Sequence, residues 1–128
     1  MKSHKDECLF CQVELNLVVA ENELCYARKD GFPVAEFHTL IIPKRHIANY
    51  FDLYQPEINA IHQMLEKIKM EIEERDGSVT RFNIGVNAGE DAGQTIFHVH
   101  VHLIPRRKGD VDNPRGGVHG AIPGKQNY

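Results

Sequence analysis

Residues 98–105 read His-Val-His-Val-His-Leu-Ile-Pro, and this octet constrains the chain more than any other segment. A period of two is the period of a β-strand, so an extended octet places His98, His100 and His102 on one face and aliphatic side chains on the other. The aliphatic face can pack on a core, which leaves the imidazole face for chemistry. Neutral imidazole donates and accepts hydrogen bonds and can act as a base, a nucleophile or a metal ligand.

Length and composition limit what this strand can belong to. The chain of 128 residues has the size of one domain, so we expect a single domain over 1–128 with an irregular tail from about 106 to 128. A net charge of −3 with 26% charged residues predicts neither nucleic-acid nor membrane binding. No apolar run reaches the roughly 18 residues of a membrane span, and the first residues lack the apolar core of a signal peptide, so we expect a cytoplasmic protein.

The remaining pattern predicts an α+β fold. Isoleucine and leucine recur at intervals of three and four between residues 55 and 75, which indicates one long amphipathic helix. Short β-prone runs occupy 15–20, 23–28, 37–42, 81–86 and 96–104, and the first two resemble a hairpin. The class is therefore separate strands and a helix rather than alternating βαβ units.

Spacing alone leaves three interpretations of the histidines open. A His-x-His pair with His38 as a further ligand can hold a catalytic zinc. His100 can instead attack a phosphorus while its neighbours orient the ring, or the histidines can be an idle solvent-facing row. Gln94 and Thr95, which follow a Gly- and acid-rich loop at 87–93, offer an amide and a hydroxyl suited to phosphate oxygens.

These motifs together resemble the histidine-triad (HIT) family of nucleotide hydrolases and transferases, in its Hint/Fhit-like branch. His98 to Ile104 matches the family pattern of three histidines separated by apolar residues at every position. The segment from Phe37 to His46 is similar to the family's His-x-apolar-Pro-Lys-x-His stretch, and Asn87 to Gln94 is similar to its Asn-x-Gly…Gly-Gln loop.

The resemblance implies a fold and an activity. The family fold is an antiparallel sheet of about five strands with one long helix and short helical segments, and its members usually form homodimers that join two sheets. The implied reaction is hydrolysis at the α-phosphate of a nucleoside phosphoramidate or dinucleoside polyphosphate through a nucleotidyl-histidine intermediate. The substrate is a small nucleotide, and no cofactor is required for catalysis.

The resemblance also assigns roles to residues. His100 matches the nucleophile, His102 a phosphate-side partner, His98 a neighbour in the triad and His38 a histidine that orients it. The implied nucleotide-binding residues are Asp30, for the ribose hydroxyls, and Asn87, Gln94 and Thr95, near the phosphate or leaving group. The third histidine distinguishes branches, because transferase and phosphorylase relatives carry Gln there.

Three cysteines, two of them spaced as Cys8-x-x-Cys11, argue against a disulfide scaffold and leave a metal site or buried thiols. Some members of the superfamily hold a structural zinc with such a pair, a histidine after Pro-Lys, and the first triad histidine. Those residues here are Cys8, Cys11, His46 and His98. Other members bind no metal, so both alternatives stay open.

Two functional classes remain at this point. The full triad favours a metal-independent hydrolase. The alternative is a purine-nucleotide-binding or sensing module with little catalysis, since phosphate binding and phosphate cleavage use most of the same groups.

Overall fold

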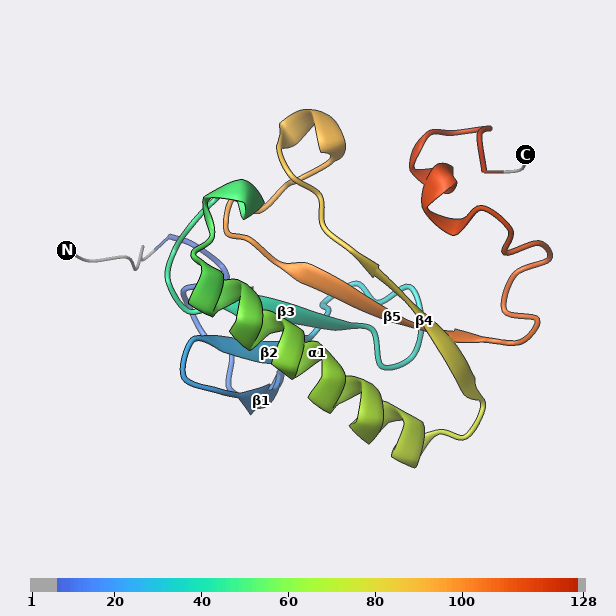
Figure 1. Cartoon of the computed structure of the whole chain (residues 1–128), viewed down its shortest axis with the longest axis horizontal. Helices are drawn as coiled ribbons and strands as arrows, with labels where there is room; N and C mark the ends of the chain where they lie inside the picture. The colour runs from blue at the N-terminus through green and yellow to red at the C-terminus, as the bar shows by residue number, and fades with distance from the viewer. Residues whose placement is uncertain (1–6, 127–128) are drawn as a thin grey trace.

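A computed structural model describes residues 7–126 and shows one five-stranded antiparallel sheet with one long helix (Figure 1). The strands lie in the order β1-β2-β3-β5-β4. They comprise β1 (Val18–Glu21), β2 (Cys25–Lys29), β3 (Thr39–Pro43), β4 (Val79–Gly85) and β5 (Val101–Arg107). The predicted α+β class, the five strands and the opening hairpin of β1 and β2 are confirmed.

Helix α1 spans Gln55–Arg75, which are the bounds that the sequence predicts. Figure 1 shows it lying across one face of the sheet, where it contacts β2, β3 and β4. The buried stripe includes Ile61, Ile68 and Ile72 and extends to Ala60 and Met64, while Ile58 and Leu65 are only partly buried. Among the described residues, no helix is long and apolar enough to cross a membrane.

The sheet carries a different apolar cluster on each face. The helix side holds the main core, to which the aliphatic residues of the octet contribute Val99, Val101 and Leu103. A smaller cluster on the other side contains Phe10, Tyr26, Leu40 and Ile42. The predicted two-faced character of the octet is therefore observed, with its aliphatic residues beneath the helix.

Strand β5 differs from the predicted range of 96–104. The strand begins only at Val101, because Val101, opposite Ile41, is the first residue of β5 that pairs with β3. The N–H of Val99 donates instead to the carbonyl of Ile47 at 2.7 Å, outside the sheet ladder. At its other end β5 includes Arg106 and Arg107, which the sequence had placed in the tail.

Three short 3-10 helices complete the described chain: η1 (Tyr50–Asp52), η2 (Glu90–Ala92) and η3 (Gly117–Ala121). They agree with the expected short helical segments. The last of them lies within the tail, which is otherwise built of turns and bends up to Gln126.

Candidate functional site

Pairing of the central strands brings polar side chains together on the sheet face opposite α1. Leu40 of β3 lies between Arg28 of β2 and His102 of β5 in the register of the sheet. Directly paired residues project to the same face, so Arg28, Leu40 and His102 form one row. Leu40 of this row belongs to the smaller apolar cluster, and the histidine site lies beside that cluster.

The ring of His100 is oriented by its own chain. Its Nδ1 lies 2.8 Å from the carbonyl oxygen of His98, which can only accept, so Nδ1 carries the proton. In the neutral ring this leaves a lone pair on Nε2. The ring of Phe10 meets it edge to face, with centroids 4.9 Å apart. The outcome is an imidazole in a defined tautomer with an unprotonated nitrogen.

A second chain of hydrogen bonds gives His102 the opposite tautomer. The backbone N–H of Val34 donates to Nδ1 of His38 at 3.1 Å, so the proton of neutral His38 is on Nε2. That Nε2 lies 3.0 Å from Nδ1 of His102, which must accept. Neutral His102 therefore carries its proton on Nε2. Nε2 of His100 is therefore an acceptor and Nε2 of His102 is a donor.

Asp30 lies beside this histidine pair. Its Oδ2 is 3.3 Å from Nε2 of His38 and 3.8 Å from Nδ1 of His102. Its Oδ1 accepts the N–H of Phe32 at 2.7 Å, which holds the carboxylate in a tight turn after β2. Burial lowers the pKa of His38, and the negative charge of Asp30 opposes that shift.

His102 has a similar balance of effects. Burial lowers its pKa, the neighbouring rings of His100 and His38 lower it further, and Asp30 raises it. Both imidazoles therefore favour the neutral form in the folded chain. The hydrogen bond from Val34 also occupies the lone pair of His38, so this ring has no ready lone pair for a metal. The ligand atoms of Asp30, His38 and His102 lie within 4.8 Å of one another, but a metal on Nε2 of His38 would have to replace the proton that the Val34 contact places there.

The turn before His38 is strained. Phe37 has a φ of 70°, and it is the one non-glycine residue with positive φ among residues 7–126. For an L-residue this conformation costs about 1–2 kcal/mol. It lets the carbonyl of Phe37 accept from the hydroxyl of Thr39 at 2.8 Å, just where β3 begins. Strain of this kind is common beside functional residues.

A second cluster joins Cys8, Cys11, His46 and His98. Their ligand atoms all lie within 4.8 Å of one another. The Sγ atoms of Cys8 and Cys11 lie 3.3 and 3.6 Å from Nδ1 of His98, and Sγ of Cys11 lies 3.3 Å from Nδ1 of His46. Around a tetrahedral zinc, sulfur and nitrogen ligands are about 3.5 Å apart, given bond lengths of about 2.3 and 2.0 Å. The donor set and its dimensions therefore fit zinc.

His98 has the tautomer that this cluster needs. Its Nε2 lies 2.7 Å from the carbonyl oxygen of Pro43, so Nε2 carries the proton and Nδ1 faces the thiols with a lone pair. The side chain is completely buried. The hydrogen bond to a carbonyl is the usual second contact of a metal-binding histidine.

His46 is positioned by an ion pair one residue earlier. Arg45 donates from Nε and Nη2 to the two carboxylate oxygens of Glu57 at 2.9 and 2.8 Å. Glu57 is buried, and its hydrogen bonds to Arg45 lower its pKa. It also accepts the N–H of Tyr54, which ties the segment to the start of α1.

Cys25, by contrast, lies in the core, where burial raises the pKa of its thiol to about 11.

The loop before the octet depends on Gln94. Its Oε1 accepts the N–H of Gly89 at 2.9 Å, and its Nε2 donates to the carbonyls of Ala48 and Ile96 at 2.9 and 3.1 Å. Gly89 has a φ of 101°, a conformation that L side chains rarely adopt. The buried Gln94 amide therefore organises backbone here. Asn87 and Thr95 are exposed on the same loop.

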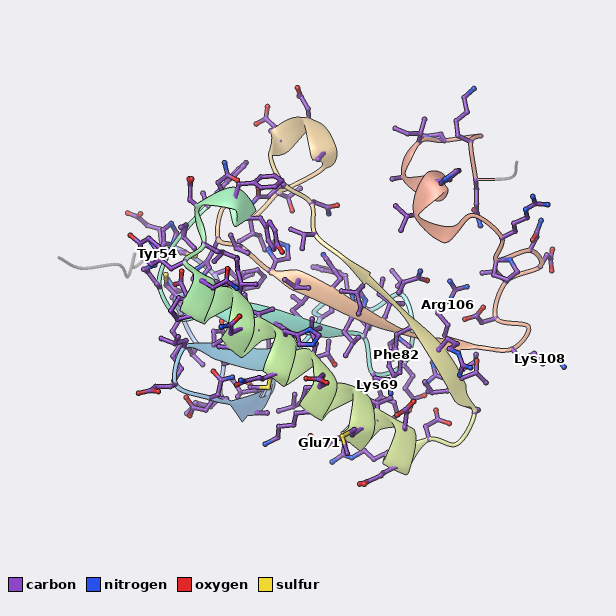
Figure 2. The ribbon with its side chains drawn as sticks, viewed as in Figure 1. Tyr54, Lys69, Glu71, Phe82, Arg106 and Lys108 are labelled. Atoms are coloured by element: carbon purple, nitrogen blue, oxygen red, sulfur yellow. The ribbon has the colours of Figure 1, made fainter. Side chains whose placement is uncertain are left out.

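The basic residues after the octet have acidic partners. Arg106 binds Asp110 through Nε at 2.8 Å, and Arg107 binds Asp76 through Nη2 at 2.9 Å. Figure 2 shows Arg106 beside β4 and Lys108 at the turn where the chain leaves the sheet. Arg106 is four residues beyond His102 along an extended strand, about 13 Å away. Arg106 and Arg107 are therefore paired with carboxylates at the end of β5 that lies away from His102.

Sequence reasoning missed two contacts of the site. The carbonyl of Pro43, which binds His98, has no sequence signature because any residue has a carbonyl. Phe10 touches the ring of His100 and is 3% exposed, yet before the fold is known it is one apolar residue among many. Its place between two potential metal-binding cysteines is the one signal that could have singled it out.

The lowered pKa values of His38 and His102 predict a pH-dependent stability. Both groups bind protons less tightly in the folded chain, so the unfolded chain takes up more protons as the pH falls. The free energy of unfolding should therefore decline as the pH drops through the ordinary histidine value of 6.5 and level off below the folded pKa values. Urea unfolding of the wild type at about pH 7.5 and 5.5 measures this loss.

His38→Gln should show a smaller loss over the same interval, because its amide does not titrate. The control is His62→Gln, since His62 lies on the exposed side of α1 with a side chain 72% accessible. An equal loss in wild type and His38→Gln would contradict the prediction.

Comparison with known proteins identifies the family. The HIT domain family matches residues 13–109. A 16.1 kDa HIT-like protein of Mycoplasma pneumoniae is 37% identical over 105 residues, which are 79% of this chain and 72% of that protein. The adenylylsulfatase HINT3 of Arabidopsis thaliana is 34% identical over 83% of this chain and 55% of its own length. The asymmetrical bis(5'-nucleosyl)-tetraphosphatase of Schizosaccharomyces pombe is 41% identical over 61% of this chain and 42% of its own length.

Solved structures agree with this match. A HIT family protein from Bacillus anthracis is 38% identical, with a TM-score of 0.73 over 80% of this chain and 74% of that one. A zinc-bound histidine triad family protein from Mycobacterium smegmatis is 30% identical, with a TM-score of 0.74 over 81% of this chain and 78% of that one. The chain belongs to the HIT domain family, whose members include nucleotide hydrolases.

Proposed function

We propose that the protein hydrolyses a nucleoside phosphoramidate or a dinucleoside polyphosphate at the α-phosphate, through a nucleotidyl intermediate on His100. The observation that carries the proposal is the pair of opposite tautomers. Nε2 of His100 has a lone pair because Nδ1–H of the same ring donates a hydrogen bond to the His98 carbonyl. Nε2 of His102 has a proton because Nδ1 of that ring accepts a hydrogen bond from His38. Hydrolase names among the relatives support the same class of reaction.

In the first step, Nε2 of His100 attacks the α-phosphorus and the bond to the leaving group breaks. The leaving atom takes the bonding electron pair and accepts a hydrogen bond from Nε2–H of His102. Where that atom is nitrogen, the proton moves to it and leaves a negative charge on His102, which the positive nucleotidyl-His100 beside it and the N–H of His38 offset. Splitting one displacement into two steps lowers each barrier.

In the second step, water attacks phosphorus and the bond to Nε2 of His100 breaks. A proton of the water passes to Nε2 of His102 if that nitrogen gave one up in the first step, and otherwise passes to solvent. The positive charge of the His100 intermediate is favoured by the Nδ1–H bond to the His98 carbonyl. Both rings then return to their starting tautomers.

The remaining predicted residues fit around this reaction. We assign Asp30 to the ribose hydroxyls, since its carboxylate lies 3.8 Å from Nδ1 of His102. Asn87 and Thr95 are exposed on the loop before the octet, where they can meet the phosphate or the leaving group. We assign Gln94 to shaping that loop, because both ends of its amide are bonded to backbone.

Two variants separate the proposed nucleophile from the proposed donor. His100→Asn should remove hydrolysis of both a nucleoside phosphoramidate and a dinucleoside tetraphosphate, because no attacking nitrogen remains. His102→Asn should slow the phosphoramidate by roughly 10²–10⁴-fold, the usual size of acid–base catalysis. It should slow a p-nitrophenyl ester of the same nucleotide far less, since nitrophenolate leaves without a proton. Steady-state kinetics measure all of these effects.

His62→Asn is the matched control, because this histidine is exposed on α1, and it should retain wild-type rates. Turnover by His100→Asn would contradict the proposal. Tight nucleotide binding by the wild type without turnover of any substrate would favour the nucleotide-sensing alternative.

We also propose that Cys8, Cys11, His46 and His98 hold a structural zinc. The distances and the tautomer of His98 fit the metal, and the zinc-bound relative from Mycobacterium smegmatis supports the assignment. All four protein ligands would close a tetrahedral site and leave no open position for substrate. When bound, the metal supplies stability by joining the start of the chain to the octet. No step of the reaction passes through it.

Loss of one zinc ligand tests this assignment. Cys11→Ser should lower the zinc content from about one per chain towards zero, and should lower Tm by about 5 °C or more, because structural zinc contributes directly to folding. Elemental analysis and thermal unfolding measure the two effects. Cys25→Ser controls for loss of a thiol, since Cys25 lies outside the cluster, and it should keep its zinc. Wild-type protein that binds no zinc would overturn the assignment.

A homodimer and a cytoplasmic location stay predictions. The edge strand β4 carries Ile84, which is 53% exposed, and this supports an association through that edge.

A further inference from the structure

Arg28 is buried, and no charged residue between 7 and 126 forms an ion pair with it. Its side chain is only 5% exposed, and Nη1 has no hydrogen-bond partner among the residues that the structure describes. Within those residues, the guanidinium makes one hydrogen bond, from Nε to the carbonyl of Lys29 at 3.1 Å. Removing an unpaired guanidinium from water is costly, and an apolar residue in its place would avoid that cost. The histidine mechanism does not use this residue.

The position of Arg28 connects it to the proposed reaction centre. It shares the row through Leu40 with His102, on the sheet face opposite α1. Its guanidinium carbon lies 5.3 Å from the centre of the Phe10 ring, and the same ring contacts His100. Arg28 and the proposed nucleophile are therefore neighbours of one aromatic side chain.

The shared row and the shared contact with Phe10 suggest the direction in which the base of a bound nucleotide extends. With the α-phosphate at His100 and the ribose at Asp30, as in the proposed function on which this inference rests, the base extends towards Arg28. A Cβ added to Gly31 would lie 3.8 Å from Nη2 of Arg28, so residue 31 places no side chain against the guanidinium. Leu9, which precedes Phe10, and Val13, which lies three residues beyond it, are exposed apolar residues (46% and 48%).

We propose that Arg28 recognises the base and selects 6-oxopurine nucleotides. The guanidinium presents two parallel N–H donors, which match the adjacent O6 and N7 acceptors of guanine. Adenine places an N6 amino donor beside N7, so one of the two donors would face another donor. The guanidinium must turn to reach the base, and at Nη1 it loses no hydrogen bond by doing so.

Binding of nucleoside monophosphates tests the proposal without any turnover. Isothermal titration of the wild type should give at least about fivefold tighter binding of GMP than of AMP, the lower end of the discrimination by one bidentate contact. IMP should bind like GMP, because it shares O6 and N7, and 7-deaza-GMP should lose affinity. In Arg28→Met the ratio of GMP to AMP affinity should fall to near one. Arg81→Met removes an exposed arginine from β4 and should keep the wild-type ratio.

Thermal unfolding separates recognition from a structural role. Because Arg28 is buried and unpaired, Arg28→Met should keep or raise Tm. A lower Tm with an unchanged ratio of affinities would overturn the proposal, as would equal binding of AMP and GMP by the wild type. A preference for GMP without hydrolysis of any substrate would remove the proposed reaction and leave the role of Arg28 standing. Hydrolysis without base preference would leave the proposed reaction standing and remove the role of Arg28.

Discussion

The hydrogen bond from Nδ1 of His100 to the carbonyl of His98 is the interaction on which the account of the site depends. It gives the ring a lone pair on Nε2 without help from another side chain. The backbone that supplies the carbonyl is held because Val99 is buried on the helix side and its N–H binds Ile47. Packing of the aliphatic face of the octet thereby positions the imidazole face.

His98 connects the two clusters of the chain. Its ring faces the cysteine pair and binds the carbonyl of Pro43, while its own carbonyl orients His100. A metal at the first cluster would hold the backbone that orients the second. The histidines of one strand-like segment thus divide into a proposed zinc ligand, a ring with a lone pair and a ring with a proton.

Much of the fold could be predicted because it depends on local periodicity. The bounds of α1 follow from its apolar spacing, and the two faces of the octet follow from a period of two. The start of β5 could not be predicted, because it depends on where β3 stops pairing. The burial of Arg28 could not be predicted either. A charged residue near the end of β2 suggests a solvated side chain, and its cover includes Phe10 from another part of the chain.

The candidate site likewise has features that the sequence predicts and features that it does not. Sequence patterns predict which residue types meet, and the structure places His38 beside His102 and Cys8 beside His98. Tautomers follow from donors and acceptors that no side-chain pattern reveals, namely the N–H of Val34 and the carbonyls of His98 and Pro43. The role of Gln94 as an organiser of the loop depends on three backbone groups in the same way.

Nitrogen-15 NMR of the imidazoles tests the central claim most directly, because it reports which nitrogen of each ring carries the proton. At neutral pH the account predicts the Nδ1–H tautomer for His100 and the Nε2–H tautomer for His38 and His102. A proton on Nε2 of neutral His100, or on Nδ1 of neutral His102, would contradict it.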